Sequence, residues 1–290
     1  MHVRRWGPEP AAGEAPLVLL HGFQDTGDTF QFLVDALERD RSVLAPDWRG
    51  FGRSEGTRAS YWFPDYFADL DALLEQLSPE RPVHLVGHSM GGNIASTYAG
   101  VRPERVASVV NLEGVGLPRT RPSDAPARLR RWLEEVRQVP PLKRYASFEE
   151  LAQVIGARFP RFGAERARFV AEAWAQALPD GGVQLLGDAR HRWVNPILYK
   201  REDQEAHWAQ IKAPVLLVLS GASDYLRSLG ADGTPEALRA LLPGAQLALI
   251  AQAGHMMHIE APGEVAALLE RFLNALDTGA SLGVGARGAA

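Results

Sequence analysis

The chain has 290 residues, with 31 Lys or Arg against 35 Asp or Glu, so its formal net charge is −4 at pH 7. That balance argues against nucleic acid or an anionic membrane as the main partner. The absence of cysteine excludes disulfides, thiolate catalysis and cysteine-ligated metals. No apolar stretch reaches membrane-spanning length and the first residues lead into no long apolar run, so we expect a cytoplasmic protein.

Short apolar runs alternate with amphipathic segments along most of the chain. Several of the runs are nearly all apolar, which is typical of parallel strands buried on both faces. Between them, apolar residues recur at helical spacing, as at Phe67, Leu70 and Leu74. This alternation predicts an α/β fold with a mostly parallel, doubly wound sheet. The predicted strands span residues 17–20, 42–45, 83–86, 106–112, 215–219 and 246–250.

The alternation breaks between residues 114 and 207. This segment is rich in helical stretches, has several prolines near its start, and contains no convincing buried strand. We interpret it as a helical cap inserted into a core formed by residues 1–113 and 208–277. Residues 278–290 are rich in Gly and Ala, and we predict a disordered tail there.

Residues 83–92, Val-His-Leu-Val-Gly-His-Ser-Met-Gly-Gly, contain Gly-x-Ser-x-Gly between a predicted strand and a segment able to form a helix. A nucleophile elbow requires this strand–turn–helix context, which would expose Ser89 at a helix N-terminus. Glycines flank the serine because a Cβ on either side would collide across so tight a bend. The pattern recurs around Ser54, but in a polar loop that opens no helix. Ser89 is therefore the candidate nucleophile.

A serine hydroxyl needs a base that accepts its proton as it attacks. His255 follows Gly254 on the loop between the last predicted strand and the final helix, where a tight turn would aim its imidazole at Ser89. His258 is the alternative, in an apolar stretch typical of a packed histidine. The glycine neighbour and the chain order favour His255.

A carboxylate must hold the imidazole in the right tautomer and stabilise its positive form. Asp224 follows the predicted strand at 215–219, and Glu113 follows the one at 106–112. Both would lie at the carboxyl edge of the sheet, where the sites of open α/β sheets gather. We favour Asp224, because the order Ser, Asp, His is typical of this architecture, and keep Glu113 as the alternative acid.

The developing oxyanion needs preorganised hydrogen-bond donors. The first long predicted strand ends in His21-Gly22-Phe23, so we predict the backbone N–H groups of Phe23 and Met90 as the donors. His21 itself is interpreted as a residue that braces this loop.

Ser89, His255, the His-Gly turn at 21–22 and the late Asp224 together resemble the α/β-hydrolase superfamily. Residues 46–54, Pro-Asp-Trp-Arg-Gly-Phe-Gly-Arg-Ser, look like that superfamily's loop after the second long strand. Asn-Leu-Glu-Gly at 111–114 and Asn-Pro-Ile-Leu-Tyr at 195–199, at the two ends of the cap, are similar to its serine-hydrolase-like branch. The resemblance implies a Ser-His-Asp hydrolase that needs no cofactor. Serine at the elbow disfavours haloalkane dehalogenases and epoxide hydrolases, which attack with aspartate.

The leading hypothesis is hydrolysis of carboxylic esters of small to medium apolar substrates through an acyl-enzyme. Aromatic residues of the cap would line the substrate pocket, with Trp193, Trp132 and Trp174 as candidates. A C–C bond hydrolase or cofactor-free haloperoxidase with the same triad is the first alternative. A ligand-binding receptor that keeps the fold is the alternative from another class.

A small-molecule substrate is the expected partner, and no metal is expected. His84 and His88 are four residues apart, but they lie on a predicted strand and turn rather than on one helix face. His255 and His258 form a bare pair with no nearby carboxylate cluster beyond Glu260.

Overall fold

The computed structural model describes residues 1–11 and 13–279. Most of the predicted disordered tail, residues 280–290, lies outside the described residues. No helix within these ranges combines the length and apolar character needed to cross a membrane.

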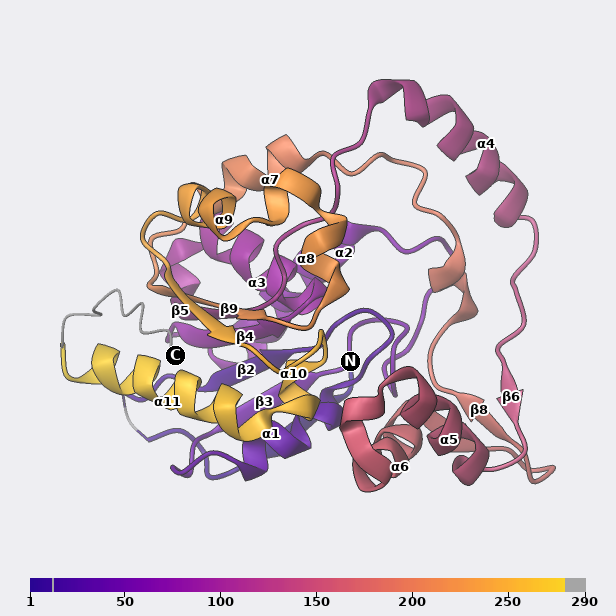
Figure 1. The fold of residues 1–290 in the computed structure, drawn as a ribbon, viewed down its shortest axis with the longest axis horizontal. Helices are drawn as coiled ribbons and strands as arrows, with labels where there is room; N and C mark the ends of the chain where they lie inside the picture. The colour runs from indigo at the N-terminus through magenta and orange to yellow at the C-terminus, as the bar shows by residue number, and fades with distance from the viewer. Residues whose placement is uncertain (12, 280–290) are drawn as a thin grey trace.

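The core is a twisted sheet whose strands, within the described ranges, run in the order β1-β3-β2-β4-β5-β9-β10 (Figure 1). The edge strand β1 is antiparallel to β3, and all other neighbours are parallel. The predicted strands are confirmed to within two residues at each end, whereas β1 was not predicted. The strands span Val3–Trp6 (β1), Leu17–Leu20 (β2), Val43–Pro46 (β3), Val83–His88 (β4), Val106–Leu112 (β5), Val215–Ser220 (β9) and Gln246–Ile250 (β10).

Helices cover both faces of this sheet. On one face, α1 (Gln31–Asp35) and α11 (Pro262–Asp277) enclose an apolar cluster that includes Leu33, Val110 and Phe272. On the other face, α2 (Phe63–Leu77) and α3 (Met90–Val101) enclose a second cluster. The short helices α8 (Asp224–Ser228) and α9 (Pro235–Leu241) follow β9, and α10 (Met257–Glu260) precedes α11. Short 3-10 helices span Gly27–Phe30, Pro103–Arg105, Pro122–Asp124, Pro160–Phe162, Ala189–Arg192 and Gly230–Gly233.

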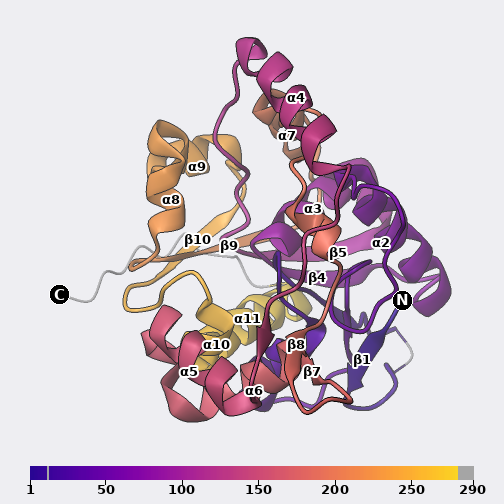
Figure 2. The ribbon, with the colours of Figure 1, turned by 90° about the vertical axis from the view of Figure 1, so that its right-hand side faces the viewer.

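The segment between β5 and β9 lies over the carboxyl edge of the sheet as a mixed structure rather than a purely helical cap (Figure 2). A small antiparallel sheet in the order β6-β8-β7 accompanies its helices, which the sequence did not indicate because these strands are only two or three residues long. Its elements are α4 (Ala125–Glu135), β6 (Arg144–Tyr145), α5 (Phe148–Arg158), α6 (Gly163–Trp174), β7 (Ala175–Ala177), β8 (Val183–Leu185) and α7 (Arg201–Trp208).

Helix α7 falls inside the predicted cap range but packs against the core. A Cβ on Gly100 of α3 would lie 2.0 Å from the carbonyl oxygen of His207, so the two helices approach closely. Gln204 of α7 also donates a hydrogen bond to Thr97 of α3. The part of the cap that stands clear of the sheet therefore ends before α7.

Candidate active site

Ser89 occupies the sharp turn between β4 and α3. Its backbone has φ 52° and ψ −114°, a conformation that a non-glycine residue rarely adopts. Its N–H donates to the carbonyl of Leu112, 2.9 Å away on β5. A Cβ on Gly91 would lie 2.0 Å from the carbonyl oxygen of Leu20, and one on Gly87 would lie 2.3 Å from that of Gly91. The backbone packing thus requires glycine at both flanks, and the turn is held in its strained conformation by the sheet.

His255 lies beside the serine, on the loop between β10 and α10. Its Nε2 is 3.0 Å from Ser89 Oγ, within hydrogen-bond distance. The preceding Gly254 donates its N–H to Glu260 Oε2 at 2.6 Å, which closes the loop that carries the imidazole. This geometry allows His255 to accept the serine proton.

Glu113 is the carboxylate that the structure brings to the histidine. Its Oε2 lies 2.7 Å from His255 Nδ1, and its side chain is fully buried. Its other oxygen, Oε1, accepts the backbone N–H of Ser220 at 3.0 Å and the Ser220 hydroxyl. Glu113 has φ 58° immediately after β5, and this left-handed residue turns the carboxylate toward the neighbouring strand β9.

The expectation that Asp224 orients the imidazole is corrected by this arrangement. Asp224 begins α8, where its carboxylate pairs with Arg227 and its side chain is 85% exposed. The next residue, Tyr225, turns inward and places its ring 5.1 Å from the His255 ring. At the start of α8, Asp224 thus faces solvent, and Glu113 takes the position beside His255.

The loop after β2 carries the predicted oxyanion donors. Among the hydrogen bonds of the described residues, none uses the backbone N–H of Phe23 or of Met90. Gln24, next to Phe23, has φ 59°, and Met90 is the first residue of α3. His21 braces the loop as expected, because its Nε2 accepts the N–H of Trp48 at 2.9 Å while its Nδ1 donates to the Gly22 carbonyl at 2.7 Å.

His258, the alternative base, points away from Ser89. It is fully buried, with its ring 4.9 Å from that of Phe30 and its Nε2 3.4 Å from Asp25 Oδ2. The structure therefore brings His255, and not His258, to the serine.

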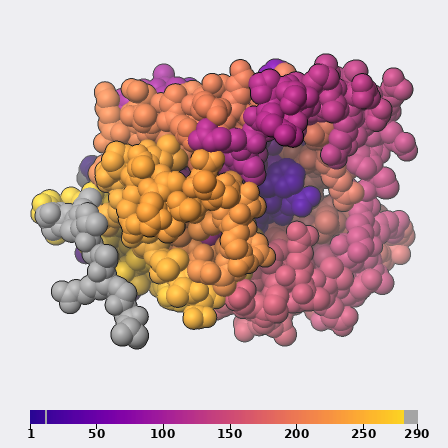
Figure 3. Space-filling view, turned by 45° about the horizontal axis from the view of Figure 1, so that its top comes forward, coloured from indigo at the N-terminus to yellow at the C-terminus, as the bar shows by residue number. Residues whose placement is uncertain are grey.

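A cavity of about 610 Å³ opens over Ser89, and both Ser89 and Met90 line it. Phe23, Trp193 and Tyr225 add aromatic surface to its wall. Of the other two predicted pocket residues, Trp132 donates its indole N–H to Ser60, and Trp174 lines a different cavity beside Asp25. Figure 3 shows the molecule hollowed between the segments of α4, α5–α6 and α8–α9, with N-terminal residues at the floor of the hollow.

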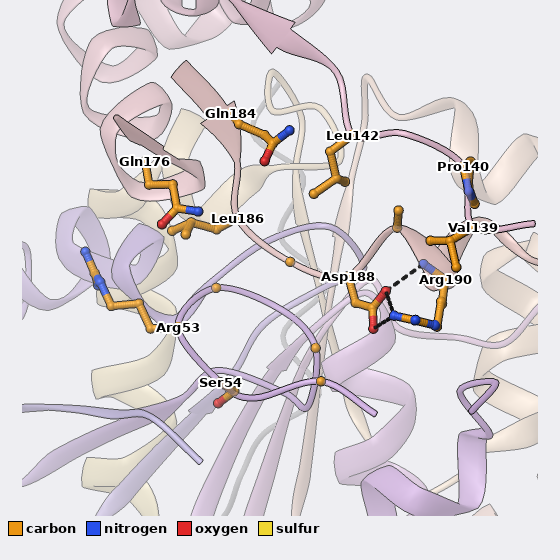
Figure 4. Close-up of a pocket in the computed structure, with 15 residues that line it drawn as sticks. Arg53, Ser54, Val139, Pro140, Leu142, Gln176, Gln184, Leu186, Asp188 and Arg190 are labelled. Atoms are coloured by element: carbon orange, nitrogen blue, oxygen red, sulfur yellow. Dashed lines mark hydrogen bonds and ion pairs between the residues drawn. The ribbon is translucent and has the colours of Figure 1, made fainter. Parts of the chain in front are cut away.

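A second cavity, of about 690 Å³, lies between the Gly50–Gly56 loop and the cap (Figure 4). Arg190 and Asp188 on its wall pair with each other at 3.1 Å, and Arg53 pairs with Asp28. None of Ser89, Glu113 and His255 is among the described residues that line it. The chemistry therefore belongs to the cavity over Ser89.

Ser220 and His88 were missed by the sequence reasoning. Ser220 is the first polar residue after the apolar run of β9, and its place next to Glu113 follows from the pairing of β5 with β9. His88 precedes the nucleophile, and its Nε2 lies 2.8 Å from the backbone carbonyl oxygen of His255. The available signal for both was a polar residue at the carboxyl end of an apolar strand of the central sheet.

Within the described part of the chain, Asp25, His88 and His258 are a group whose potential ligand atoms all lie within 4.8 Å of one another. Neither histidine pair considered from the sequence makes up this group. His258 Nε2 already faces the Asp25 carboxylate, so the imidazole can supply the partner that a cation would otherwise provide.

Several known proteins are similar to this chain. The model of a family described as the alpha/beta hydrolase fold matches residues 15–262. The serine hydrolase-like protein of Danio rerio is 28% identical over 277 residues, which cover 92% of this chain and 83% of that protein. Esterase YbfF of Escherichia coli is 24% identical over 281 residues, which cover 94% of this chain and 99% of that esterase. The solved thioesterase domain from the curacin biosynthetic pathway has a TM-score of 0.79 and 26% identity, covering 93% of this chain and 94% of its own.

Proposed function

Because the chain belongs to the α/β-hydrolase family, we propose that it is a serine hydrolase that cleaves carboxylic esters through an acyl-enzyme. The observation that carries the proposal is the continuous chain of contacts from Ser89 Oγ through His255 to the buried Glu113 carboxylate. A hydroxyl, a base and an orienting acid in this sequence of contacts activate a nucleophile.

In the proposed reaction, Ser89 Oγ attacks the ester carbonyl and His255 Nε2 accepts the hydroxyl proton. The backbone N–H groups of Phe23 and Met90 stabilise the oxyanion of the tetrahedral intermediate. His255 then donates the proton to the departing alkoxide, which leaves as the alcohol. Water, deprotonated by the same imidazole, attacks the acyl-enzyme and releases the carboxylic acid and free Ser89.

Glu113 keeps the His255 proton on Nδ1, so that Nε2 is free to accept. Its carboxylate also stabilises the imidazolium that forms after proton transfer. The two hydrogen bonds from Ser220 hold this carboxylate in place within the core.

The cavity over Ser89 suits an ester with an apolar or aromatic group of modest size. Its volume of about 610 Å³ falls in the range of small-molecule sites. Aromatic side chains of Phe23, Trp193 and Tyr225 would contact that group, and we infer that they set substrate preference. The esterase and thioesterase names of two similar proteins support acyl transfer as the reaction class.

The test is hydrolysis of p-nitrophenyl esters, from acetate to long-chain acyl groups, by wild type, Ser89→Ala and Ser54→Ala. Ser54 is the matched control because it carries the second Gly-x-Ser-x-Gly pattern, but its buried hydroxyl donates to the Asp47 carbonyl. We expect Ser89→Ala to abolish turnover and Ser54→Ala to retain it. A folded wild type without turnover would overturn ester hydrolysis in favour of the C–C hydrolase or receptor alternatives.

A further inference from the structure

A buried polar cluster lies behind the triad and takes no part in the proposed proton transfer. His258, His88 and Asp25 are 0%, 1% and 2% exposed, respectively. Buried polar groups cost free energy unless they find partners, so such a cluster needs a structural or functional explanation. Its contacts lead from the catalytic loop to the cap.

His88 is the end of the cluster that touches the catalytic loop. Its Nε2 lies 2.8 Å from the carbonyl oxygen of His255, and since a carbonyl only accepts, this nitrogen must carry the proton. Burial lowers the pKa of His88 well below its usual range, so the ring stays neutral with its proton on Nε2. A Cβ on Gly22 would lie 2.9 Å from the other nitrogen, Nδ1, which leaves the ring little room to turn.

His258 connects His88 to Asp25. The two imidazole rings are 4.4 Å apart, and His258 Nε2 lies 3.4 Å from Asp25 Oδ2. Burial alone would raise the pKa of Asp25, but its close contact with His258 holds that pKa below its usual value. The carboxylate therefore stays charged and keeps His258 oriented between Asp25 and His88.

Asp25 is the end of the cluster that touches the cap. Its Oδ1 accepts the Trp174 indole N–H at 2.8 Å, together with the Thr29 hydroxyl at 2.9 Å and the Thr26 N–H at 2.8 Å. Trp174 is the last residue of α6. The contact lies beside a cavity of about 150 Å³ that both residues line, so the cap is not closely packed on the core at this point.

We propose that His88, His258 and Asp25 are positioning residues that hold the His255 loop and couple it to Trp174 of the cap. This inference rests on the proposed function, because it assigns the cluster to the placement of the catalytic imidazole. A shift of the His255 backbone would lengthen the 3.0 Å contact between Nε2 and Ser89 Oγ. Misplacement of a catalytic group by about 1 Å can cost on the order of 100-fold in rate.

The first experiment compares His88→Leu, His88→Gln and the matched control His84→Leu. His84 lies on the same strand, but its Nδ1 bonds Ser108, away from the triad. Three quantities are measured: kcat per reactive serine, KM, and the rate constant with which a fluorophosphonate labels the serine. Titration with the same fluorophosphonate counts the reactive serines. We expect His88→Leu to lower kcat and the labelling rate by about 10- to 100-fold with little change in KM. His88→Gln, which restores a donor, should recover most of the loss.

The second experiment tests the cap end with Trp174→Phe against Trp6→Phe. Each variant removes one indole N–H donor, from Asp25 in the first case and from Gln31 in the second. We expect Trp174→Phe to lower kcat per reactive serine roughly threefold to tenfold, as loss of a hydrogen bond to a charged group can. Trp6→Phe should leave it unchanged. This variant keeps the proposal testable if His88→Leu does not fold.

Equal kcat and labelling rates in His88→Leu and His84→Leu, or in Trp174→Phe and Trp6→Phe, would overturn the coupling. A Zn²⁺-dependent rate in the wild type that EDTA removes, and that His258→Gln lacks, would instead assign the cluster to a metal. Failure of the proposed function would look different. In that case Ser89 could still react with the fluorophosphonate while no ester is hydrolysed, and the labelling rates would still test the positioning role.

Discussion

Glu113 Oε2 lies 2.7 Å from His255 Nδ1, across 142 positions of sequence. This contact joins the end of β5 to the loop after β10, which are separated in the sheet by β9. Ser220, at the end of β9, donates to the other carboxylate oxygen and fills the space between them. Glu113 is thus held by β9, the strand that lies between β5 and β10 in the sheet.

Substitution of the acid should distinguish the two candidate carboxylates. In Glu113→Gln, the Ser220 donors would orient the amide oxygen, so the amide NH₂ would face His255 and favour the wrong imidazole tautomer. We expect kcat to fall by about 10² to 10⁴. Asp224→Asn, at an exposed position, should stay close to wild type. Steady-state kinetics on the best ester decide this, and a larger loss in Asp224→Asn would return the acid role to that residue.

The elbow should not tolerate a methyl group at position 91. A Cβ there would lie 2.0 Å from the Leu20 carbonyl oxygen, which is part of the sheet and cannot move aside easily. We expect Gly91→Ala to lower the free energy of unfolding by about 3 kcal/mol and to abolish activity. Gly244→Ala is the control, since a Cβ at position 244 would meet no described atom within 4 Å. Urea unfolding measures both, and equal midpoints would contradict the packing argument.

Stability should fall as the solution becomes mildly acidic. Burial lowers the pKa of His84 to about 4, whereas the same side chain titrates near 6.5 in the unfolded chain. Between these values the unfolded state binds the proton more readily, so the contribution of His84 is complete above pH 6.5 and is lost as the pH falls toward 4. His84→Gln should lose less stability than wild type between pH 7 and pH 4.5. Urea unfolding at the two pH values measures this loss. An equal loss of unfolding free energy in wild type and His84→Gln would show that His84 does not contribute.

Trp193 should affect substrate binding more than Trp132 does. Trp193 lines the cavity over Ser89, whereas Trp132 lies outside that lining. For an aromatic ester, we expect Trp193→Ala to raise KM about tenfold with a smaller change in kcat, equivalent to ~1.4 kcal/mol of lost contact. Trp132→Ala should raise KM much less. The reverse ranking would place the substrate nearer α4 than the cavity indicates.

The sheet and the elbow could be predicted because local pattern determines them. Apolar runs define the parallel strands, and the pairing of Gly87 and Gly91 with a following helix defines the turn at Ser89. The placement of His255 also followed from local sequence, since glycine precedes it on a loop after the last strand. Strand β1 was missed because Val3–Trp6 contains two arginines and lies at an edge, where burial is incomplete.

The acid could not be chosen from sequence because its choice depends on a backbone angle and a sheet order. Glu113 reaches His255 through a left-handed residue at the end of β5, and Asp224 is turned outward by the start of α8. Neither property appears in the spacing of charged residues. The His88–His258–Asp25 cluster was equally hidden, because its members come from a strand end, a short helix and a loop that meet only in the folded chain.

Glu113, the proposed catalytic acid, lies where the cap leaves the core, and this bears on how caps can be exchanged between such enzymes. Asn111 binds Gly114 through both side-chain atoms, and a Cβ on Gly114 would lie 2.3 Å from the Ser89 carbonyl oxygen. At the other root, Arg201 donates to the Val115 carbonyl and closes the neck of the insertion. A chimaera that exchanges caps should therefore be joined after Gly116 and before Arg201. A junction placed before Gly116 or after Arg201 would bring in a new pocket, but it would also disrupt the contacts that hold Glu113 beside His255.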